Sequence, residues 1–211
     1  MAPARKPDNE ISLRATPGGF GTPTFEHRGL TRQVRVEGVE LVYGQGESES
    51  RAPIGSLAEA GILVGELLGP DTALDPAPLE IDAEAAAVLA AWFGLGGEVL
   101  ELLVAEAGPD HAATAPRLWP EHFDIAIESG SESAGRRANY GFSPGDGDHP
   151  EPYVYVGPWR DDLAGELWNA TGFNGAELGY ADLLGAADPL QTALEFCRAR
   201  RQALETIGKT G

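Results

Sequence analysis

Cysteine and basic residues are scarce in this chain of 211 residues. The single cysteine, Cys197, excludes an intramolecular disulfide framework and a zinc site built from several cysteines. The chain carries 15 Lys and Arg residues against 33 Asp and Glu residues, which gives a formal net charge of −18. Nucleic acids and anionic membranes are bound mainly through clustered Lys and Arg, so the composition argues against both as partners.

Long hydrophobic runs are also absent. The first 15 residues are rich in charge and lack the apolar region of a secretion signal. The longest uncharged apolar run, residues 85–97, has 13 residues, whereas spanning a bilayer takes about 20. We therefore expect a cytoplasmic protein.

The charge is unevenly distributed. Residues 1–36 carry six basic and three acidic side chains, so their net charge of +3 leaves −21 for the remainder. This basic segment is typical of a self-association surface, which would make the protein a homo-oligomer. Alternatively, it is a solvated edge strand whose Arg residues oppose aggregation.

The first half of the chain predicts strands followed by two helices. Residues 11–15 favour a strand, and residues 33–36 and 39–43 favour a β-hairpin with one charged face, followed by a polar loop over 44–50. Ser56 and Glu59 form a capping box at the start of a helix that Gly69-Pro70 ends. Asp82 caps a second helix that extends to about residue 107, with glycines inside it that indicate two helical pieces or a close crossing.

The second half predicts more strands and a last helix. Residues 123–127, 138–142 and 153–156 have strand periodicity, and residues 167–173 are a candidate fourth strand. Asp188-Pro189 begins a helix that buries Cys197. The short links between strands favour antiparallel pairing. We therefore predict an α+β fold, in which about three helices pack on one face of one or two antiparallel sheets. Residues 1–10 form a disordered arm and residues 11–211 one domain, with a subdivision into 11–110 and 111–211 as the alternative.

Residues 118–170 contain four dense segments that resemble a family of uncharacterised actinobacterial proteins. They are Trp-Pro-x-His-Phe-Asp at 119–124, Asn-Tyr-Gly-x-Ser-Pro-Gly-Asp at 139–146, His-Pro-Glu-Pro-Tyr at 149–153 and Trp-Asn at 168–169. The resemblance implies an actinobacterial origin and no known activity. The Gly-x-Ser-x-Gly pattern at 141–145 does not indicate a hydrolase, because the residue after Ser143 is Pro144, which has no N–H for an oxyanion hole.

Amphipathic aromatic and polar residues of the same region predict a ligand pocket. We expect this pocket between the sheet and the long helix; the alternative is that these residues are the core of the sheet. The predicted pocket residues are Trp119, His122, Asp124, Asn139, Tyr140, Tyr153, Tyr155, Trp159, Trp168 and Asn169.

A metal site is a further candidate. His122 and Asp124 would share one face of a strand, and with His149 they could form a two-His-one-carboxylate site. Alternatively, His122 and Asp124 form a hydrogen-bonded pair that fixes a loop.

Three functions stay open on this sequence. The first is a small-molecule-binding protein or cofactor-independent enzyme with an aromatic-lined pocket. The second is a metal-dependent enzyme that uses His122, Asp124 and His149, and the third is a non-catalytic homo-oligomeric interaction protein. The pattern indicates no particular cofactor, reaction or substrate.

Overall fold

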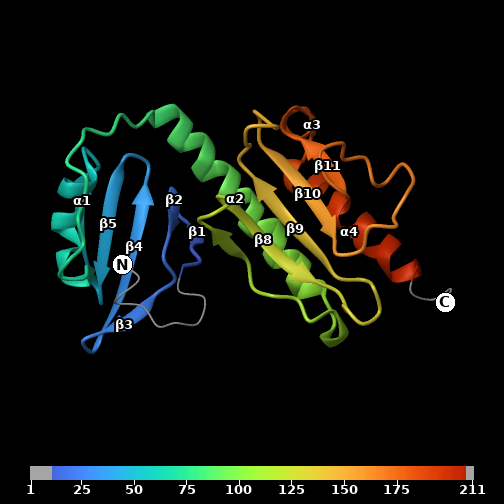
Figure 1. The fold of residues 1–211 in the computed structure, drawn as a ribbon, viewed down its shortest axis with the longest axis horizontal. Coiled ribbons are helices and arrows are strands. Elements are labelled where there is room, and N and C mark those ends of the chain that lie inside the picture. Colours follow the sequence, from blue (N-terminus) through green and yellow to red (C-terminus); the bar gives the residue numbers. More distant parts are fainter. Residues whose placement is uncertain (1–10, 208–211) are drawn as a thin grey trace. The chain divides into compact units, whose positions relative to one another are not determined.

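The computed structural model describes residues 11–207, so the arm predicted at 1–10 lies outside the described residues. The chain forms two compact units, Met1–Gly94 and Leu95–Gly211, and each is described by itself (Figure 1). Each unit has one antiparallel sheet accompanied by helices, which confirms the predicted α+β fold.

From residue 11 onward, the first unit contains six strands, a short α-helix, a 3-10 helix and the beginning of the long helix α2. Its elements are β1 (Arg14–Thr16), β2 (Gly19–Gly21), β3 (Phe25–His27), β4 (Leu30–Glu37), β5 (Glu40–Gln45), β6 (Ser48–Pro53), α1 (Leu57–Leu63) and the 3-10 helix η2 (Gly65–Leu67). The strand order is β1-β2-β4-β5-β6, and β3 pairs with β4. One face of this sheet carries Val34 and Tyr43, which pack with Val64 and Leu67.

The predicted hairpin is confirmed as β4 and β5, but the loop predicted over 44–50 is wrong. β5 continues to Gln45 and turns directly into β6. β6 is a polar edge strand without hydrophobic alternation, so its pairing with β5 left no apolar signal in the sequence.

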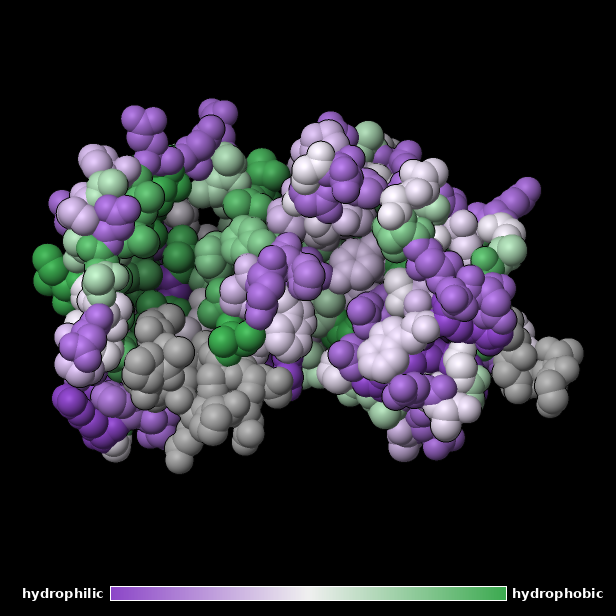
Figure 2. Space-filling view, viewed as in Figure 1, coloured by the Kyte–Doolittle hydropathy of each residue, from purple (hydrophilic) through white to green (hydrophobic). Residues whose placement is uncertain are grey.

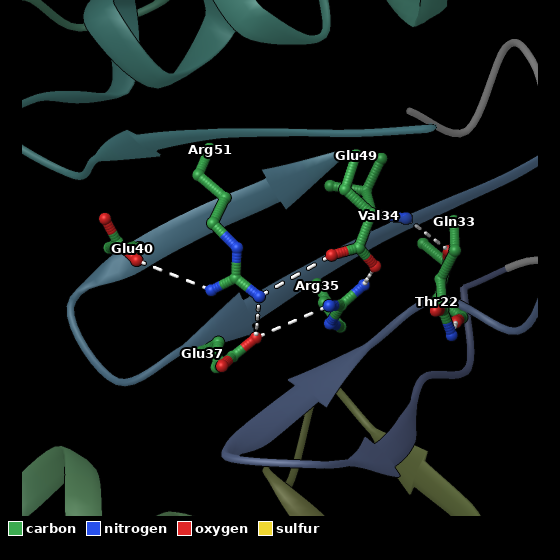
Figure 3. A network of polar contacts seen from close by, with 8 residues as sticks. All are labelled: Thr22, Gln33, Val34, Arg35, Glu37, Glu40, Glu49 and Arg51. Atoms are coloured by element: carbon green, nitrogen blue, oxygen red, sulfur yellow. Dashed lines mark hydrogen bonds and ion pairs between the residues drawn. The ribbon is translucent and has the colours of Figure 1, made fainter. Parts of the chain in front are cut away.

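The opposite face of this sheet carries a network of ion pairs (Figure 3). Arg35 on β4 and Arg51 on β6 both contact Glu37 and Glu49, at distances between 2.8 and 3.5 Å. Glu40 lies 3.5 Å from Arg51. The network therefore links β4, β5 and β6 on the charged face that the alternation predicted.

The capping box before α1 is partly confirmed. The Ser56 hydroxyl accepts a hydrogen bond of 3.1 Å from the backbone N–H of Glu59. The helix is shorter than predicted, because α1 ends at Leu63 and the chain tightens into η2.

Helix α2 (Ala83–Glu106) is continuous through its glycines and crosses from the first unit into the second. Among the described residues it is the one helix long and apolar enough to span a membrane, a test that core helices of globular proteins also pass. Within the second unit it behaves as a core helix, because Val99, Leu100 and Leu103 are fully buried. A Cβ added at Gly96 would lie 2.8 Å from Phe142 and 2.9 Å from Ile125, so this glycine permits a close approach to the sheet.

The second unit contains a five-stranded antiparallel sheet in the order β11-β10-β9-β8-β7. Its further elements are the 3-10 helix η3 (Pro109–His111), β7 (Arg117–Trp119), β8 (Asp124–Ser129), β9 (Ala138–Ser143), β10 (Tyr153–Pro158), β11 (Ala176–Gly179), α3 (Tyr180–Leu184) and α4 (Pro189–Ile207). The last helix starts at Pro189 as predicted, and Cys197 on it is fully buried. The strand predicted over 167–173 is wrong: the chain there is irregular, and the fifth strand is β11.

The two faces of this second sheet differ in chemistry. Opposed residues in an antiparallel pair point to the same face, and the register places Ile125, Phe142 and Val154 in one row of the helix-covered face. All three are buried. The neighbouring row on the other face reads Ala126, Gly141, Tyr155 and Glu177 from β8 to β11.

Candidate ligand-binding site

A depression of about 600 Å³ lies on the second face of this sheet. Its residues come from the turn before β8, from β8 to β10, and from the loops on either side of β10. The residues that line it are Glu121, His122, Asp124, Asn139, Ser143, Asp146, Asp148, His149, Tyr153, Tyr155, Gly157, Gly172 and Phe173. Hydrophilic residues predominate over β8–β10, whereas hydrophobic ones gather over β4, β5 and α1 (Figure 2).

The position of this depression corrects the prediction. The pocket was expected between the sheet and the long helix, but Gly96 of α2 packs against Ile125 and Phe142 on the opposite face. Tyr140 belongs to that opposite face and is fully buried. It borders a separate small cavity of about 20 Å³ beside Arg201 and Leu204.

Asp124 and Tyr155 form the central contact of the depression. The Tyr155 hydroxyl donates a hydrogen bond to Oδ2 of Asp124. The other carboxyl oxygen, Oδ1, is buried and has no hydrogen-bond partner. Asp124 is only 7% exposed, and this burial raises the pKa of its carboxyl group, an effect that the Tyr155 hydroxyl partly opposes. Burial also raises the pKa of Tyr155 well above its usual value.

A small residue on the neighbouring strand makes room for Tyr155. Gly141 lies directly opposite Tyr155 in the register. A Cβ at Gly141 would lie 2.4 Å from Cζ of Tyr155, so the ring lies across β9 and reaches toward β8. Phe173 packs edge-on against the same ring, with 6.3 Å between the centroids.

The turn between β7 and β8 places His122 and Asp124. Its last residue, Phe123, has a positive φ of 53°, a conformation that costs an L residue roughly 1–2 kcal/mol. His122 therefore lies in the turn and not on a strand, which corrects the prediction that it shares a strand face with Asp124. Both residues still line the depression.

His149 is held by carboxylates on the opposite side of the depression. Its Nε2 lies 3.1 Å from Glu177 Oε2 on β11, and its Nδ1 lies 3.6 Å from Asp146 Oδ1. Its ring stacks on Tyr153, with 4.5 Å between the centroids. Asp146 also accepts hydrogen bonds from the backbone N–H groups of His149 and Asp148, which lower the pKa of its carboxyl group.

The predicted metal ligands share the depression without forming a metal-binding set. Within residues 11–207, no three His, Cys, Asp or Glu side chains are placed so that they could hold a metal ion together. Instead, His149 is hydrogen-bonded to Glu177 on β11, and Asp124 accepts a hydrogen bond from Tyr155. Nor does the structure show a hydrogen bond between His122 and Asp124.

Four of the predicted aromatic and amide residues lie outside the depression. Trp119 on β7 lies beside Arg117, and Trp159 is half-exposed and donates a 3.0 Å hydrogen bond to Asn139. Trp168 follows a turn closed by its backbone hydrogen bond to Gly165. The Asn169 amide pairs with the backbone of Glu177 and fixes the loop to β11.

Five of the ten predicted pocket residues do line the depression, namely His122, Asp124, Asn139, Tyr153 and Tyr155. The predicted pocket did not include seven of the residues that line the depression, namely Glu121, Ser143, Asp146, Asp148, Gly157, Gly172 and Phe173, and His149 was predicted only as a metal ligand. The alternation of Asn139, Gly141 and Ser143 with Tyr140 and Phe142 was a usable signal, because it separates a small polar face of β9 from an apolar one. Gly172 and Phe173 reach the site through an irregular loop, for which no periodicity exists.

Comparison with protein-family models, curated proteins and solved structures finds no match to this chain.

Proposed function

We propose that this protein binds a small organic molecule in the depression over β8, β9 and β10. Ligand sites typically have volumes of roughly 300–1,000 Å³ and combine apolar surface with a few orienting polar groups. The depression, at about 600 Å³, combines Tyr153, Tyr155 and Phe173 with carboxyl, imidazole and amide groups.

The observation that carries the proposal is the unpaired Oδ1 of Asp124. A buried polar atom without a partner costs about 1–3 kcal/mol, and more when it is charged. Such an atom calls for an explanation, and among the described residues Asp124 is the residue with one that lines this depression. A ligand in the depression toward which the carboxyl group turns, and which donates a hydrogen bond to Oδ1, would remove this cost, and this gain would contribute to binding.

The test is an NMR screen of the ¹⁵N-labelled full chain against a fragment library with equal numbers of cationic, anionic and neutral compounds. We expect hits that shift the amide signals of Gly141, Tyr155 and Gly157 together. A screen without hits, or hits that shift only signals elsewhere in the chain, would overturn the proposal.

A blocking variant makes the screen specific. Gly157 lines the depression, and a Cβ added there meets nothing within 4 Å. Gly157→Phe should therefore fill the depression and abolish the shifts without disturbing the fold. Gly65→Phe in the first unit is the matched control, because a Cβ at Gly65 also meets nothing within 4 Å, and it should leave binding unchanged.

A further inference from the structure

We infer that the ligand of this depression is an organic cation that carries N–H groups, such as an alkylammonium or a guanidinium. The inference rests on the proposed function and names the chemical class of ligand for the same site. It follows from the charge of the site, from the need of one buried oxygen and from the position of the aromatic rings.

The charge of the depression favours a cation. Its lining includes four carboxyl groups, on Glu121, Asp124, Asp146 and Asp148, and the described residues that line it include no Lys or Arg. An anionic ligand would meet these like charges without a Lys or Arg partner, and the imidazole of His149 is already paired with Glu177 and Asp146, so its binding is unfavourable. A cationic ligand is attracted by the same charges as it approaches.

The unpaired carboxyl oxygen of Asp124 favours cations that carry N–H groups over those that carry none. Oδ1 of Asp124 is an acceptor without a donor, and Asp124 is more than nine-tenths buried. A primary amine or a guanidinium donates N–H to such an acceptor in a charge-assisted hydrogen bond. A quaternary ammonium ion has no N–H and would leave Oδ1 unpaired.

The aromatic side chains fit the organic part of such a ligand. Tyr153 and Tyr155 have ring centroids 6.1 Å apart, and Phe173 lies against Tyr155. Aromatic faces attract a cation through their quadrupole and also bury apolar carbon. A small cation with an apolar skeleton therefore matches both the carboxyl groups and the aromatic rings of the site, whereas a bare metal ion leaves the rings unused.

Four compounds with one skeleton test the inference by calorimetry on the full chain. They are phenethylamine, its N,N,N-trimethyl derivative, phenethyl alcohol and phenylacetate. We expect phenethylamine to bind, the trimethyl derivative to bind at least about tenfold more weakly because it lacks the N–H donor, and the alcohol and phenylacetate to bind more weakly still.

Two variants tie the preference to Asp124. Asp124→Asn keeps the size of the side chain and an acceptor for Tyr155 but removes the charge, and it should weaken phenethylamine binding at least about tenfold. Glu166→Gln is the matched control, because Glu166 is exposed and lies outside the depression, and it should change nothing. The ¹H–¹⁵N spectrum of each variant confirms that it is folded.

The outcomes separate the inference from the proposed function. If fragments bind at the depression but the trimethyl derivative, the alcohol or phenylacetate binds as tightly as phenethylamine, or Asp124→Asn binds unchanged, the ligand class is wrong and the binding function stands. If phenethylamine fails to bind while other fragments bind there, the ligand class is again wrong. If no fragment of any charge binds there, both fail.

Discussion

Gly141→Ala should destabilise the second unit although alanine is normally better tolerated in a strand than glycine. The new Cβ would lie 2.4 Å from the Tyr155 ring, whereas carbon atoms in contact lie roughly 3.5–4 Å apart. Tyr155 is held by its row on the sheet and by Phe173, so it must shift by more than 1 Å, roughly the difference between these distances. That shift breaks its hydrogen bond to Asp124.

The expected cost combines three effects. Overpacking typically costs about 1–3 kcal/mol, and losing a hydrogen bond to a charged acceptor costs about 1.5–3 kcal/mol. Replacing glycine by alanine restricts the unfolded chain and returns about 0.4–1 kcal/mol. We therefore expect the free energy of unfolding to fall by about 2–4 kcal/mol, measured by urea denaturation.

Gly157→Ala is the matched control for this substitution. Gly157 lies on the same face of the neighbouring strand, where a Cβ meets nothing within 4 Å, so the free energy of unfolding should stay constant or rise by about 0.5 kcal/mol. In a Tyr155→Ala background, Gly141→Ala should lose its cost. Equal effects at the two glycines, or a cost that persists without the Tyr155 ring, would refute the reasoning.

Three further predictions concern helices α2 and α4. Gly96→Ala should lower the free energy of unfolding by about 1–2 kcal/mol, because its Cβ would meet Phe142. Gly94→Ala, where a Cβ meets nothing within 4 Å, should raise the free energy of unfolding by up to about 1 kcal/mol. Equal effects of the two substitutions in urea denaturation would contradict the close approach of α2 to the sheet. Burial raises the pKa of the Cys197 thiol to about 12, so at pH 8 a thiol reagent should react with it only as fast as the protein unfolds. A rapid reaction without denaturant would refute the burial of Cys197. Arg198 and Arg201 hold the pKa of Glu106 below its usual range, so Glu106→Gln should lower the free energy of unfolding by about 1 kcal/mol at pH 7. This difference in stability from wild type should shrink as the pH falls below about 4, where the carboxyl group becomes protonated. A difference that stays constant down to acid pH would contradict the ion pair.

Most of the regular elements could be predicted because their signals are local. The cap at Ser56, the apolar face of α2, the start of α4 at Pro189 and the alternation along β8, β9 and β10 each depend on neighbouring residues only. The strand predicted over 167–173 failed because its aromatic residues belong to a loop anchored by Asn169 and not to a ladder.

The side of the sheet that carries the depression could not be read from the sequence. The aromatic residues of 119–168 were treated as one cluster, but the strand register divides them between two faces. Tyr140 points to the helix-covered face, and Tyr153 and Tyr155 point to the open one. Which face a helix covers is decided by packing over long sequence separations, here by Gly96 against Phe142.

The hydrogen-bond partners of the titratable groups could not be predicted from the sequence either. His149 looked free to bind a metal, because Glu177 follows it 28 residues later on a strand that was not predicted. Asp124 looked like a partner of His122 on the same strand, whereas the structure joins it to Tyr155, 31 residues away. Such pairings follow from register, and register depends on the whole sheet.

The titration of Asp124, followed by carboxyl ¹³C NMR with and without phenethylamine, tests the central claim most directly. Burial raises the pKa of this carboxyl group in the free protein, and a bound cation favours the ionised form. The midpoint for Asp124 should therefore lie above that of an exposed aspartate and fall when the amine saturates the protein. A midpoint that is unchanged or rises under saturating amine would contradict the account.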